Sequence, residues 1–352
     1  MTEPRVWFNK TFSSVYNAIR LLRAADAPVK AHVHTTHINP DFVGFEVSHS
    51  RALEPVGLSE EDYVGWCLET CERERIDVFI PGRAVIPIAE NRAAFESKGI
   101  RLLIAASPEM MTLFEDKARF YRELDPAVAV PARFITVNTA DQFSQACEQF
   151  RNERVTACFK PSRSVGALGF RILDDSRGDL QNLMGGEPIR ITTSLATSIL
   201  ASQPEFRDLL VMEYLDGPEY SIDCVASQGR LLRAVARRKP VRLGGSQLLE
   251  DRPELLAMAE RLTRAYGLDS LFNIQVRYLG DIPKILEINA RMSGGIYFAC
   301  LSGLNLPAWA VALACNAVKE DELPQPRLGI QVSQQYQEFL VQHAVLEEPD
   351  AA

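Results

Sequence analysis

Two stretches late in the chain decide the fold: residues 272–277 read Phe-Asn-Ile-Gln-Val-Arg, and residues 285–291 read Ile-Leu-Glu-Ile-Asn-Ala-Arg. Both alternate apolar and polar side chains, which predicts two β-strands joined by the Gly-Asp turn between them. One face of the second strand would then oppose Gln275 and carry three polar side chains: Glu287, Asn289 and Arg291. An acid, an amide and a guanidinium on one face suit oxygen coordination of Mg²⁺ beside a phosphate clamp. An ordinary solvent-facing strand would alternate in the same way, so both interpretations stay open.

An earlier stretch, residues 210–223, reads Leu-Val-Met-Glu-Tyr-Leu-Asp-Gly-Pro-Glu-Tyr-Ser-Ile-Asp. It predicts an apolar strand that ends on an acid, turns through Gly-Pro and enters a second strand. Glu213 and Glu219 would then point towards a shared cleft. A plain hairpin with solvated acids is the alternative.

A third stretch, residues 158–170, places Lys160 at the end of a strand and follows it with a loop of small residues. The backbone N–H groups of such a loop close over phosphates, while the lysine supplies a point charge. The loop residues that suit this role are Ser164, Gly166 and Gly169. Because the lysine precedes the loop, the stretch is not a GxxxxGK[ST] phosphate loop. A surface lysine beside a turn is the alternative.

The first hundred residues alternate between strand-like and helix-like patterns, which predicts a parallel sheet with crossover helices. Strands are expected at 5–8, 29–34, 77–81 and 100–105, and helices at 14–25 and 59–75. No GxGxxG occurs in the chain, which disfavours a dinucleotide site in this region.

The rest of the chain predicts a mixed, strand-rich region. A helix that starts after Ser107 carries residues 114–119, and further helices are expected at 140–151 and 194–202. Strands are expected at 210–215, 220–226, 272–278 and 284–289. One helix and a last strand-like run are expected beyond Pro307.

Together, four motifs resemble the ATP-grasp superfamily in their order and separations. They are Asp-Lys at 116–117, Phe-Lys-Pro at 159–161, Glu-Tyr-Leu-x-Gly-x-Glu-Tyr-Ser-x-Asp at 213–223 and Glu-x-Asn-x-Arg at 287–291. The resemblance covers residues 110–317 and implies a mixed α/β and α+β fold. A Rossmann-like domain that precedes the ATP-grasp domain would span 1–108, and a two-lobed ATP-grasp domain 109–310. Its lid lobe would span 120–210 and its metal-binding lobe 211–310, before a C-terminal segment at 311–352.

The resemblance also implies roles for individual residues. Lys117 and Lys160 look like the two lysines that hold the nucleotide phosphates. Glu213, Tyr214 and Leu215 look like the adenine-binding hinge, and Glu219 would face the ribose. Gln275, Glu287 and Asn289 are similar to the metal-ligand set of members like carbamoyl-phosphate synthetase, where many members have an acid in place of Gln275. Arg291 stands where the family has the arginine that steadies the transferring phosphoryl group.

A basic segment is expected to follow a strand. It runs through Arg237, Arg238 and Lys239 and on to residues 242–246. Its family position suggests that it binds a substrate carboxylate or phosphate, and we expect Arg237 and Arg238 to serve catalysis. A solvated basic loop is the alternative. Residues 292–295, Met-Ser-Gly-Gly, could supply backbone donors to an anionic substrate or form a tight turn into the next helix.

Composition narrows the class of protein. A net charge of −8 argues against a nucleic-acid partner, and no apolar run is long enough to span a membrane. The N-terminus lacks the features of a secretory signal, so we expect a cytoplasmic protein. The seven cysteines include no CxxC pair and are expected to be buried, reduced thiols.

The histidines at 32, 34 and 37 fall at HxHxxH spacing and could suggest a transition-metal site. No fourth ligand is identifiable in the sequence, and alternation along a strand predicts partly exposed His32 and His34 on one face.

The family's commonest chemistry implies an ATP- and Mg²⁺-dependent ligase, in which a carboxylate becomes an acyl phosphate that an amine attacks. Its partners would be small-molecule carboxylate and amine substrates, and a homodimer is compatible with the sequence. Thiol ligation, simple phosphoryl transfer and a non-catalytic nucleotide-binding subunit are the alternatives.

Overall fold

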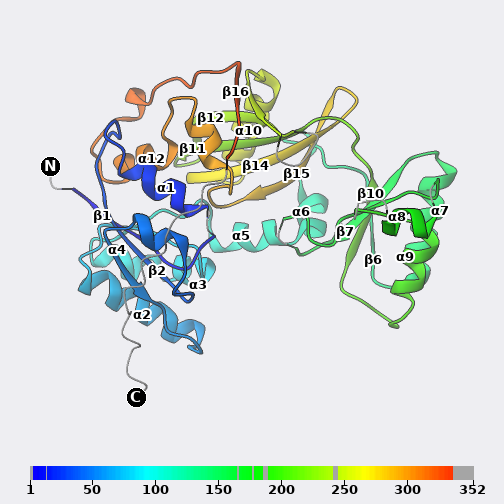
Figure 1. The fold of residues 1–352 in the computed structure, drawn as a ribbon, viewed down its shortest axis with the longest axis horizontal. Helices are drawn as coiled ribbons and strands as arrows, with labels where there is room; N and C mark the ends of the chain where they lie inside the picture. The colour runs from blue at the N-terminus through cyan, green and yellow to red at the C-terminus, as the bar shows by residue number, and fades with distance from the viewer. Residues whose placement is uncertain are drawn as a thin grey trace. The chain divides into compact units, whose positions relative to one another are not determined.

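The computed structural model describes residues 3–12, 14–164, 166–176, 178–184, 189–240 and 245–335, which form two compact units (Figure 1). Unit 1 consists of Met1–Met111, Glu219–Gln275 and Ile288–Ala352, and unit 2 of Thr112–Pro218 and Val276–Glu287. The predicted domain boundaries at 108 and 310 stay predictions. Two predicted segments, 242–244 and the chain beyond 335, lie outside the described residues.

The first sheet of unit 1 confirms the predicted parallel α/β arrangement. Its order is β3 (Ser50–Leu53), β2 (His32–His37), β1 (Arg5–Phe8), β4 (Val78–Ile80) and β5 (Arg101–Leu102). Its helices are α1 (Val15–Leu22), α2 (Glu60–Arg73), α3 (Val85–Glu90) and α4 (Arg92–Ser97), and a short 3-10 turn spans Val43–Val47. β2 begins later than predicted, because its pairing with β1 starts at His32 opposite Arg5.

A six-stranded sheet carries the motifs that decided the fold. Its order is β15 (Ile282–Asn289), β14 (Ser270–Leu279), β11 (Glu219–Ser227), β12 (Arg230–Arg238), β13 (Gln247–Glu250) and β16 (Ile330–Val332). The helices that occur between or after its strands along the chain are α10 (Pro253–Ala265), α11 (Ile296–Cys300) and α12 (Leu306–Ala314). A 3-10 turn spans Glu320–Glu322. The predicted elements do not include β13 and α10, and the strand predicted before Arg237 is β12, which continues through Arg238.

Two apolar clusters hold unit 1 together. One packs the strands β1, β2 and β4 against α1 and, through Ala308 and Val311, against α12; Figure 1 shows α1 and α12 side by side. The other joins β11, β12 and β13 to α11 and α12. Burial of such side chains contributes roughly 1.5–3 kcal/mol each, so these clusters fix the strands that carry the polar residues described below.

Unit 2 contains a mixed sheet with the order β6 (Phe134–Val137), β10 (Leu209–Glu213), β7 (Ala157–Pro161), β8 (Arg171–Leu173) and β9 (Arg190–Ile191). The helices α7 (Ala140–Asn152) and α9 (Thr193–Leu200) lie beside each other at this sheet (Figure 1). The short helix α8 spans Asp179–Met184. Buried Phe143 and Phe150 of α7 form the centre of its core.

The helix predicted after Ser107 is divided in two, α5 (Pro108–Glu115) and α6 (Lys117–Glu123). Asp116 has an extended backbone, and its side chain accepts a hydrogen bond from the Arg119 N–H, so it begins a new helix. The prediction of one continuous helix was therefore wrong. As a result Lys117 occupies the first turn of α6 rather than the middle of a helix.

His34 corrects the prediction of partly exposed strand histidines, because it is buried. It lies beside Trp7 on the neighbouring strand, and Trp66 of α2 packs edge-on against Trp7. A helix far along the chain therefore covers this sheet face. His32 is partly exposed, as predicted. All seven cysteines are free, and all but the partly exposed Cys315 are buried.

Candidate active site

Lys117 and Lys160 lie in the same polar cluster of unit 2. The Lys117 side chain is buried, and its ammonium donates to the Ser164 carbonyl oxygen at 2.9 Å and lies 3.4 Å from the Glu287 carboxylate. The Lys160 ammonium lies 3.1 Å from the Tyr121 hydroxyl oxygen. Tyr121 in turn donates to the Leu286 carbonyl oxygen at 2.6 Å. The structure therefore brings four predicted residues, Lys117, Lys160, Ser164 and Glu287, into one cluster.

The charges in this cluster suit an added anion. Burial lowers the pKa of Lys117, the positive charge of Lys160 lowers it further, and the Glu287 carboxylate acts in the opposite direction. Two ammonium groups that repel one another are both stabilised by a phosphate placed beside them. The first backbone N–H groups of α6 already donate to Ser162 and Asp116, so the two ammonium groups are the part of this cluster that suits an anion.

The loop after β7 is tied to the start of α6. The Ser162 hydroxyl donates to Asp116 at 2.7 Å, and the Lys117 N–H donates to the Ser162 carbonyl oxygen at 3.1 Å. Gly166 and Gly169 have φ angles of 62° and 78°, which glycine adopts at little cost. A Cβ on Gly169 would also lie 2.8 Å from the ring of Pro161. This loop therefore requires glycine at 169 on both grounds.

Glu213 is buried at the end of β10 and pairs with Arg133. Its carboxylate accepts a hydrogen bond from the Arg133 N–H at 2.9 Å and lies 3.5 Å from the guanidinium. Next in the chain, the Tyr214 N–H donates to the Thr156 carbonyl oxygen, and Leu215 is buried. The hinge is thus well ordered by its own contacts, and its role towards adenine stays a prediction.

Glu219 and Gln275 lie together in unit 1, on the neighbouring strands β11 and β14. The Lys239 ammonium donates to the Glu219 carboxylate at 2.5 Å and to the Gln275 side-chain oxygen at 3.4 Å. The Lys239 ammonium already lies beside the Gln275 oxygen, which the sequence resemblance predicts to be a metal ligand. Lys239 was noted in sequence only as part of the basic segment.

Asn289 and Arg291 contact each other in unit 1, but Arg291 lies beyond the end of β15. The Arg291 guanidinium donates to the Asn289 side-chain oxygen at 3.3 Å and to the Met292 carbonyl oxygen at 2.9 Å, and it lies 5.2 Å over the Phe12 ring. The prediction that Arg291 shares one strand face with Glu287 was therefore wrong, because the strand ends at Asn289.

The end of β15 carries side chains with oxygen donors. Glu287 offers a carboxylate and Asn289 an amide oxygen, two positions apart on β15, and Mg²⁺ prefers such oxygens together with phosphate and water. Across the described residues, no group of three or more His, Cys, Asp or Glu could hold a metal ion. A cation bound through one carboxylate and substrate phosphates does not need such a group.

Arg237 and Arg238 lie in β12, rather than after a strand as predicted, and they have different surroundings. Arg237 is 2% exposed and donates to Asp223, Gln247, Ser221 and Ser293. The Arg238 side chain is 46% exposed and pairs with Glu250 at 3.1 Å. Alternation along the strand separates their side chains, so the structure does not bring the two together. Asn273 and Tyr121 also join these clusters, although the sequence analysis gave neither a role.

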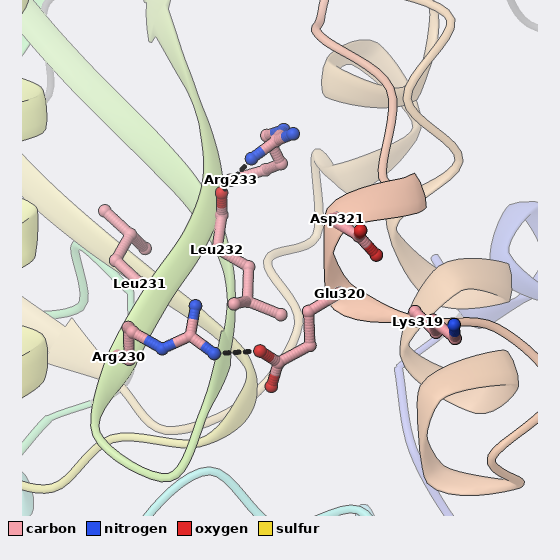
Figure 2. Close-up of a pocket in the computed structure, with 7 residues that line it drawn as sticks. All are labelled: Arg230, Leu231, Leu232, Arg233, Lys319, Glu320 and Asp321. Carbon is pink, nitrogen blue, oxygen red and sulfur yellow. Dashed lines mark hydrogen bonds and ion pairs between the residues drawn. The ribbon is translucent and has the colours of Figure 1, made fainter.

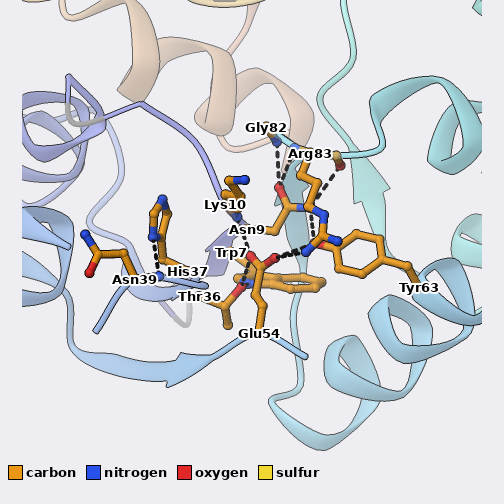
Figure 3. A network of polar contacts seen from close by, with 10 residues as sticks. All are labelled: Trp7, Asn9, Lys10, Thr36, His37, Asn39, Glu54, Tyr63, Gly82 and Arg83. Atoms are coloured by element: carbon orange, nitrogen blue, oxygen red, sulfur yellow. Dashed lines mark hydrogen bonds and ion pairs between the residues drawn. The ribbon is translucent and has the colours of Figure 1, made fainter. Parts of the chain in front are cut away.

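At the carboxyl end of the first sheet, polar side chains and backbone amides form a network of hydrogen bonds with one another (Figure 3). Buried Glu54 accepts hydrogen bonds from the Lys10 N–H after β1 and from Tyr63, and it pairs with Arg83 at 3.1 Å. Asn9 bridges from β1 to the Gly82 N–H at 2.6 Å. In dinucleotide-binding sheets the pyrophosphate lies at the turn after the first strand. Here an internal carboxylate engages the Lys10 amide in that turn.

A surface cavity of about 610 Å³ is lined by other residues than these clusters, and none of the predicted site residues lines it (Figure 2). It is flanked by β12 and the segment that begins at Lys319, and an ion pair joins Arg230 to Glu320.

Among the described residues, no helix has the length and apolar character needed to cross a bilayer.

Comparison with protein families matches residues 205–338 to "ATP-grasp in the biosynthetic pathway with Ter operon". Carnosine synthase 1 of Homo sapiens is 31% identical over an alignment of 173 residues, and the alignment covers 43% of this chain and 20% of the human protein. Carnosine synthase 1 of Gallus gallus is 39% identical over 101 residues, 25% of this chain and 11% of the chicken protein. The matched region thus spans a fifth or less of these relatives.

Solved structures with the same fold cover nearly the whole chain. N5-carboxyaminoimidazole synthetase from Staphylococcus aureus has a TM-score of 0.64 at 10% identity, covering 94% of this chain and 83% of the other. L-amino acid ligase from Bacillus licheniformis has a TM-score of 0.61 at 14% identity, covering 92% and 78%. At these identities the likeness establishes the fold.

Proposed function

Because this chain is an ATP-grasp protein, we propose that it is an ATP- and Mg²⁺-dependent ligase that joins a carboxylate to an amine. The single observation that carries the proposal is the cluster of Lys117, Lys160 and Glu287 in unit 2. ATP with Mg²⁺ supplies the phosphoryl group that turns the carboxylate into an acyl phosphate, an activated acid with a good leaving group.

In this proposal the lysines bind phosphate oxygens. Lys117 and Lys160 offset the charge of the phosphates, and the backbone of Ser164, Gly166 and Gly169 lines them. Lys117 is already held by the Ser164 carbonyl oxygen and by Glu287, so little ordering is required when a phosphate arrives. The loop excludes water from an acyl phosphate that would otherwise hydrolyse.

The remaining residues keep the roles that the family suggests. Tyr214 and Leu215 would contact adenine beside buried Glu213, and Glu219 would face the ribose. Glu287 and Asn289 would hold Mg²⁺, and Arg291 would contact the transferring phosphoryl group. For Gln275 we propose a position near the metal but no direct coordination of it, because the Lys239 ammonium lies 3.4 Å from the Gln275 side-chain oxygen. Arg238, the exposed member of the arginine pair, would meet the anionic substrate.

The proposal includes a cytoplasmic location, which the seven free thiols support. It also includes small-molecule substrates. Amino acids are the first acids and amines to test, since two of the similar proteins are called carnosine synthase and L-amino acid ligase.

The test is an ADP-release screen over pairs of amino acids with ATP and MgCl₂. We expect ADP and phosphate to form only when an acid and an amine are both present. Lys160→Ala should lose turnover and weaken MgADP binding, because its ammonium contacts phosphate, whereas Lys98→Ala on the surface serves as the matched control. Release of AMP and pyrophosphate would contradict the proposal. ADP formed with a thiol, or with an acid alone, would favour thiol ligation or simple phosphoryl transfer.

A further inference from the structure

The Arg237 guanidinium is enclosed by unit 1 and held at several points. Its Nε donates to the Asp223 carboxylate at 2.6 Å, and one Nη donates to the Ser221 hydroxyl at 3.0 Å and the Ser293 hydroxyl at 3.1 Å. The other Nη donates to the side-chain oxygen of Gln247. Four of its five N–H donors are therefore engaged by buried or partly buried protein groups.

The location of these partners explains how Arg237 links separate elements. Ser221 lies directly opposite Arg237 in the pairing of β11 with β12, and Asp223 follows two positions along β11. Ser293, by contrast, belongs to the turn between β15 and α11. One side chain thus joins the middle of the sheet to the turn that follows Arg291.

A buried ion pair adds little net stability by itself, because its desolvation offsets its attraction. Asp223 is fully buried and Arg237 nearly so, and removing both charges from water costs several kcal/mol per ion before their attraction is counted. An apolar pair would fill this space with less desolvation. The planar fork of a guanidinium, however, fixes the directions of several hydrogen bonds at once, which suits a role in holding groups in position.

Gly295 shows that the turn fits the guanidinium closely. Its φ of −102° is one that any residue adopts, so its backbone does not require glycine. A Cβ at this position would lie 2.9 Å from both Nη atoms of Arg237. At the preceding Gly294 the nearest atom to such a Cβ would be the Ser14 hydroxyl oxygen at 3.9 Å, an ordinary contact. The space at 295 is therefore taken by Arg237.

The same network continues to Asn289. Fully buried Asn273 donates to Ser221 at 2.9 Å and to Asp223 at 3.0 Å. Its side-chain oxygen accepts a hydrogen bond from the Asn289 amide at 3.5 Å. The carboxylate that holds Arg237 therefore also orients Asn273, and Asn273 contacts the residue proposed to bind Mg²⁺.

We propose that Arg237 is a positioning residue, which fixes the Ser293–Gly295 turn directly and orients Asn289 through Asp223 and Asn273. The connection to Asn289 rests on the proposed function, whereas the hold on the turn does not. In this role Arg237 acts through other residues, rather than by the substrate contact that the sequence predicts for it.

The hold on the turn is tested by hydrogen exchange in the absence of nucleotide. The reporter is the Ile296 amide, which donates to the Ser293 carbonyl oxygen. Ser293→Ala removes one hydrogen bond and should speed exchange roughly fivefold. Arg237→Lys, which keeps the charge but not the fork, should do at least as much. Ser302→Ala, another buried serine of unit 1, is the matched control and should leave this amide unchanged. Unchanged exchange in Ser293→Ala would overturn the proposal.

Gly295→Ala provides an independent test of the same contact. It should speed exchange at Ile296, whereas Gly294→Ala should not. In the Arg237→Lys background the effect of Gly295→Ala should shrink by at least half, because the flexible lysine can move away. Equal effects in both backgrounds would show that Gly295 does not act through Arg237, and would overturn this part.

The connection to Asn289 is tested by Mg²⁺ titration of ADP binding, followed by calorimetry. Arg237→Lys should raise the half-saturating Mg²⁺ concentration roughly tenfold, the low end of the cost of disturbing the partners behind a metal ligand, and leave ADP affinity at saturating Mg²⁺ unchanged. If Asn289→Ala has no effect on this titration, the proposed metal role fails while the exchange tests still stand. If Asn289→Ala has an effect and Arg237→Lys does not, the connection is refuted.

Discussion

Glu287 and Arg291 come from one short motif, yet the structure gives them different neighbours. Glu287 lies 3.4 Å from the buried Lys117 ammonium, while Arg291 contacts Asn289 and Met292 beyond the strand end. A carboxylate beside a lysine that we propose to bind phosphate suits the proposed metal ligand, and a guanidinium in a turn suits the proposed contact with the transferring group. Their truncations should therefore fail in different ways.

Glu287→Ala should raise the Mg²⁺ concentration required for turnover roughly tenfold, because Mg²⁺ loses a charged oxygen ligand. Arg291→Ala should keep MgADP binding while kcat falls roughly 10²-fold, the scale of a lost transition-state contact. Coupled ADP release and calorimetry separate the two effects, and Arg264→Ala on the exposed face of α10 is the control. Near-normal turnover in Arg291→Ala would show that its role is not catalytic.

His34 predicts a pH dependence of stability in unit 1. Burial lowers its pKa to about 4, and the charged or titratable groups that act on it are Glu74, Arg73, Arg5 and His32. Because the folded pKa lies below the unfolded value of about 6.5, the neutral side chain stabilises the fold above that pH. This stability is lost as the pH falls from about 6.5 towards 4.

His34→Asn should flatten this dependence, because asparagine does not titrate in this pH range. Its amide can retain a contact with Ser50, which lies 2.8 Å from the His34 Nδ1 atom. Chemical denaturation at pH 7 and pH 4.5 should show the wild type losing on the order of 2 kcal/mol more than the variant. The comparison uses the change with pH in each protein, so a constant cost of the substitution does not affect it. Equal losses in both proteins would contradict the explanation.

At the scale of elements, the loop after β7 shows what local sequence predicts well. A strand that ends on a lysine and is followed by two glycines indicated a loop of this kind. Gly166 and Gly169 both adopt left-handed backbone conformations. Such signals lie within a few neighbouring residues, because backbone preferences are local. The strands β10, β11, β14 and β15 were predicted for the same reason.

Gly169→Ala tests whether this loop needs its shape. The φ of 78° and the 2.8 Å approach to the Pro161 ring should together destabilise unit 2 by about 1–3 kcal/mol. MgADP affinity should fall as well, because the amides beside Lys160 move. Gly178→Ala, where the added Cβ meets open space, is the matched control. Thermal unfolding and calorimetry measure both effects, and an unaltered Gly169→Ala protein would show that the loop adapts freely.

What the sequence could not predict depends on contacts between distant elements. Alternation along β12 separates Arg237 from Arg238, but it does not say which face is covered. Both arginines were therefore expected to meet the substrate, and the burial of Arg237 was not predicted. The prediction that His34 is partly exposed was wrong for the same reason, because α2 covers this face of the sheet. Asp116 is different: its capping hydrogen bond is local, and a capping residue inside a helical pattern could have indicated the break.

At the scale of the whole molecule, the ATP-grasp fold agrees with the motifs and with the solved structures that cover 92–94% of the chain. Fold alone does not define chemistry, and the matched part of the human relative is 20% of its length. The proposed ligase function therefore rests on the polar clusters, above all on Lys117, Lys160 and Glu287. Its central claim is that the carboxylate becomes an acyl phosphate.

The most direct test uses the substrate pair found by the ADP-release screen, with ¹⁸O in the carboxylate of the acid. When the amine attacks an acyl phosphate, the former carboxylate oxygen leaves with the phosphate. Mass spectrometry should therefore find one ¹⁸O atom in the inorganic phosphate from each turnover, and unlabelled ADP. Unlabelled phosphate, or ¹⁸O in AMP, would show that the acid is not activated as an acyl phosphate and would contradict the account.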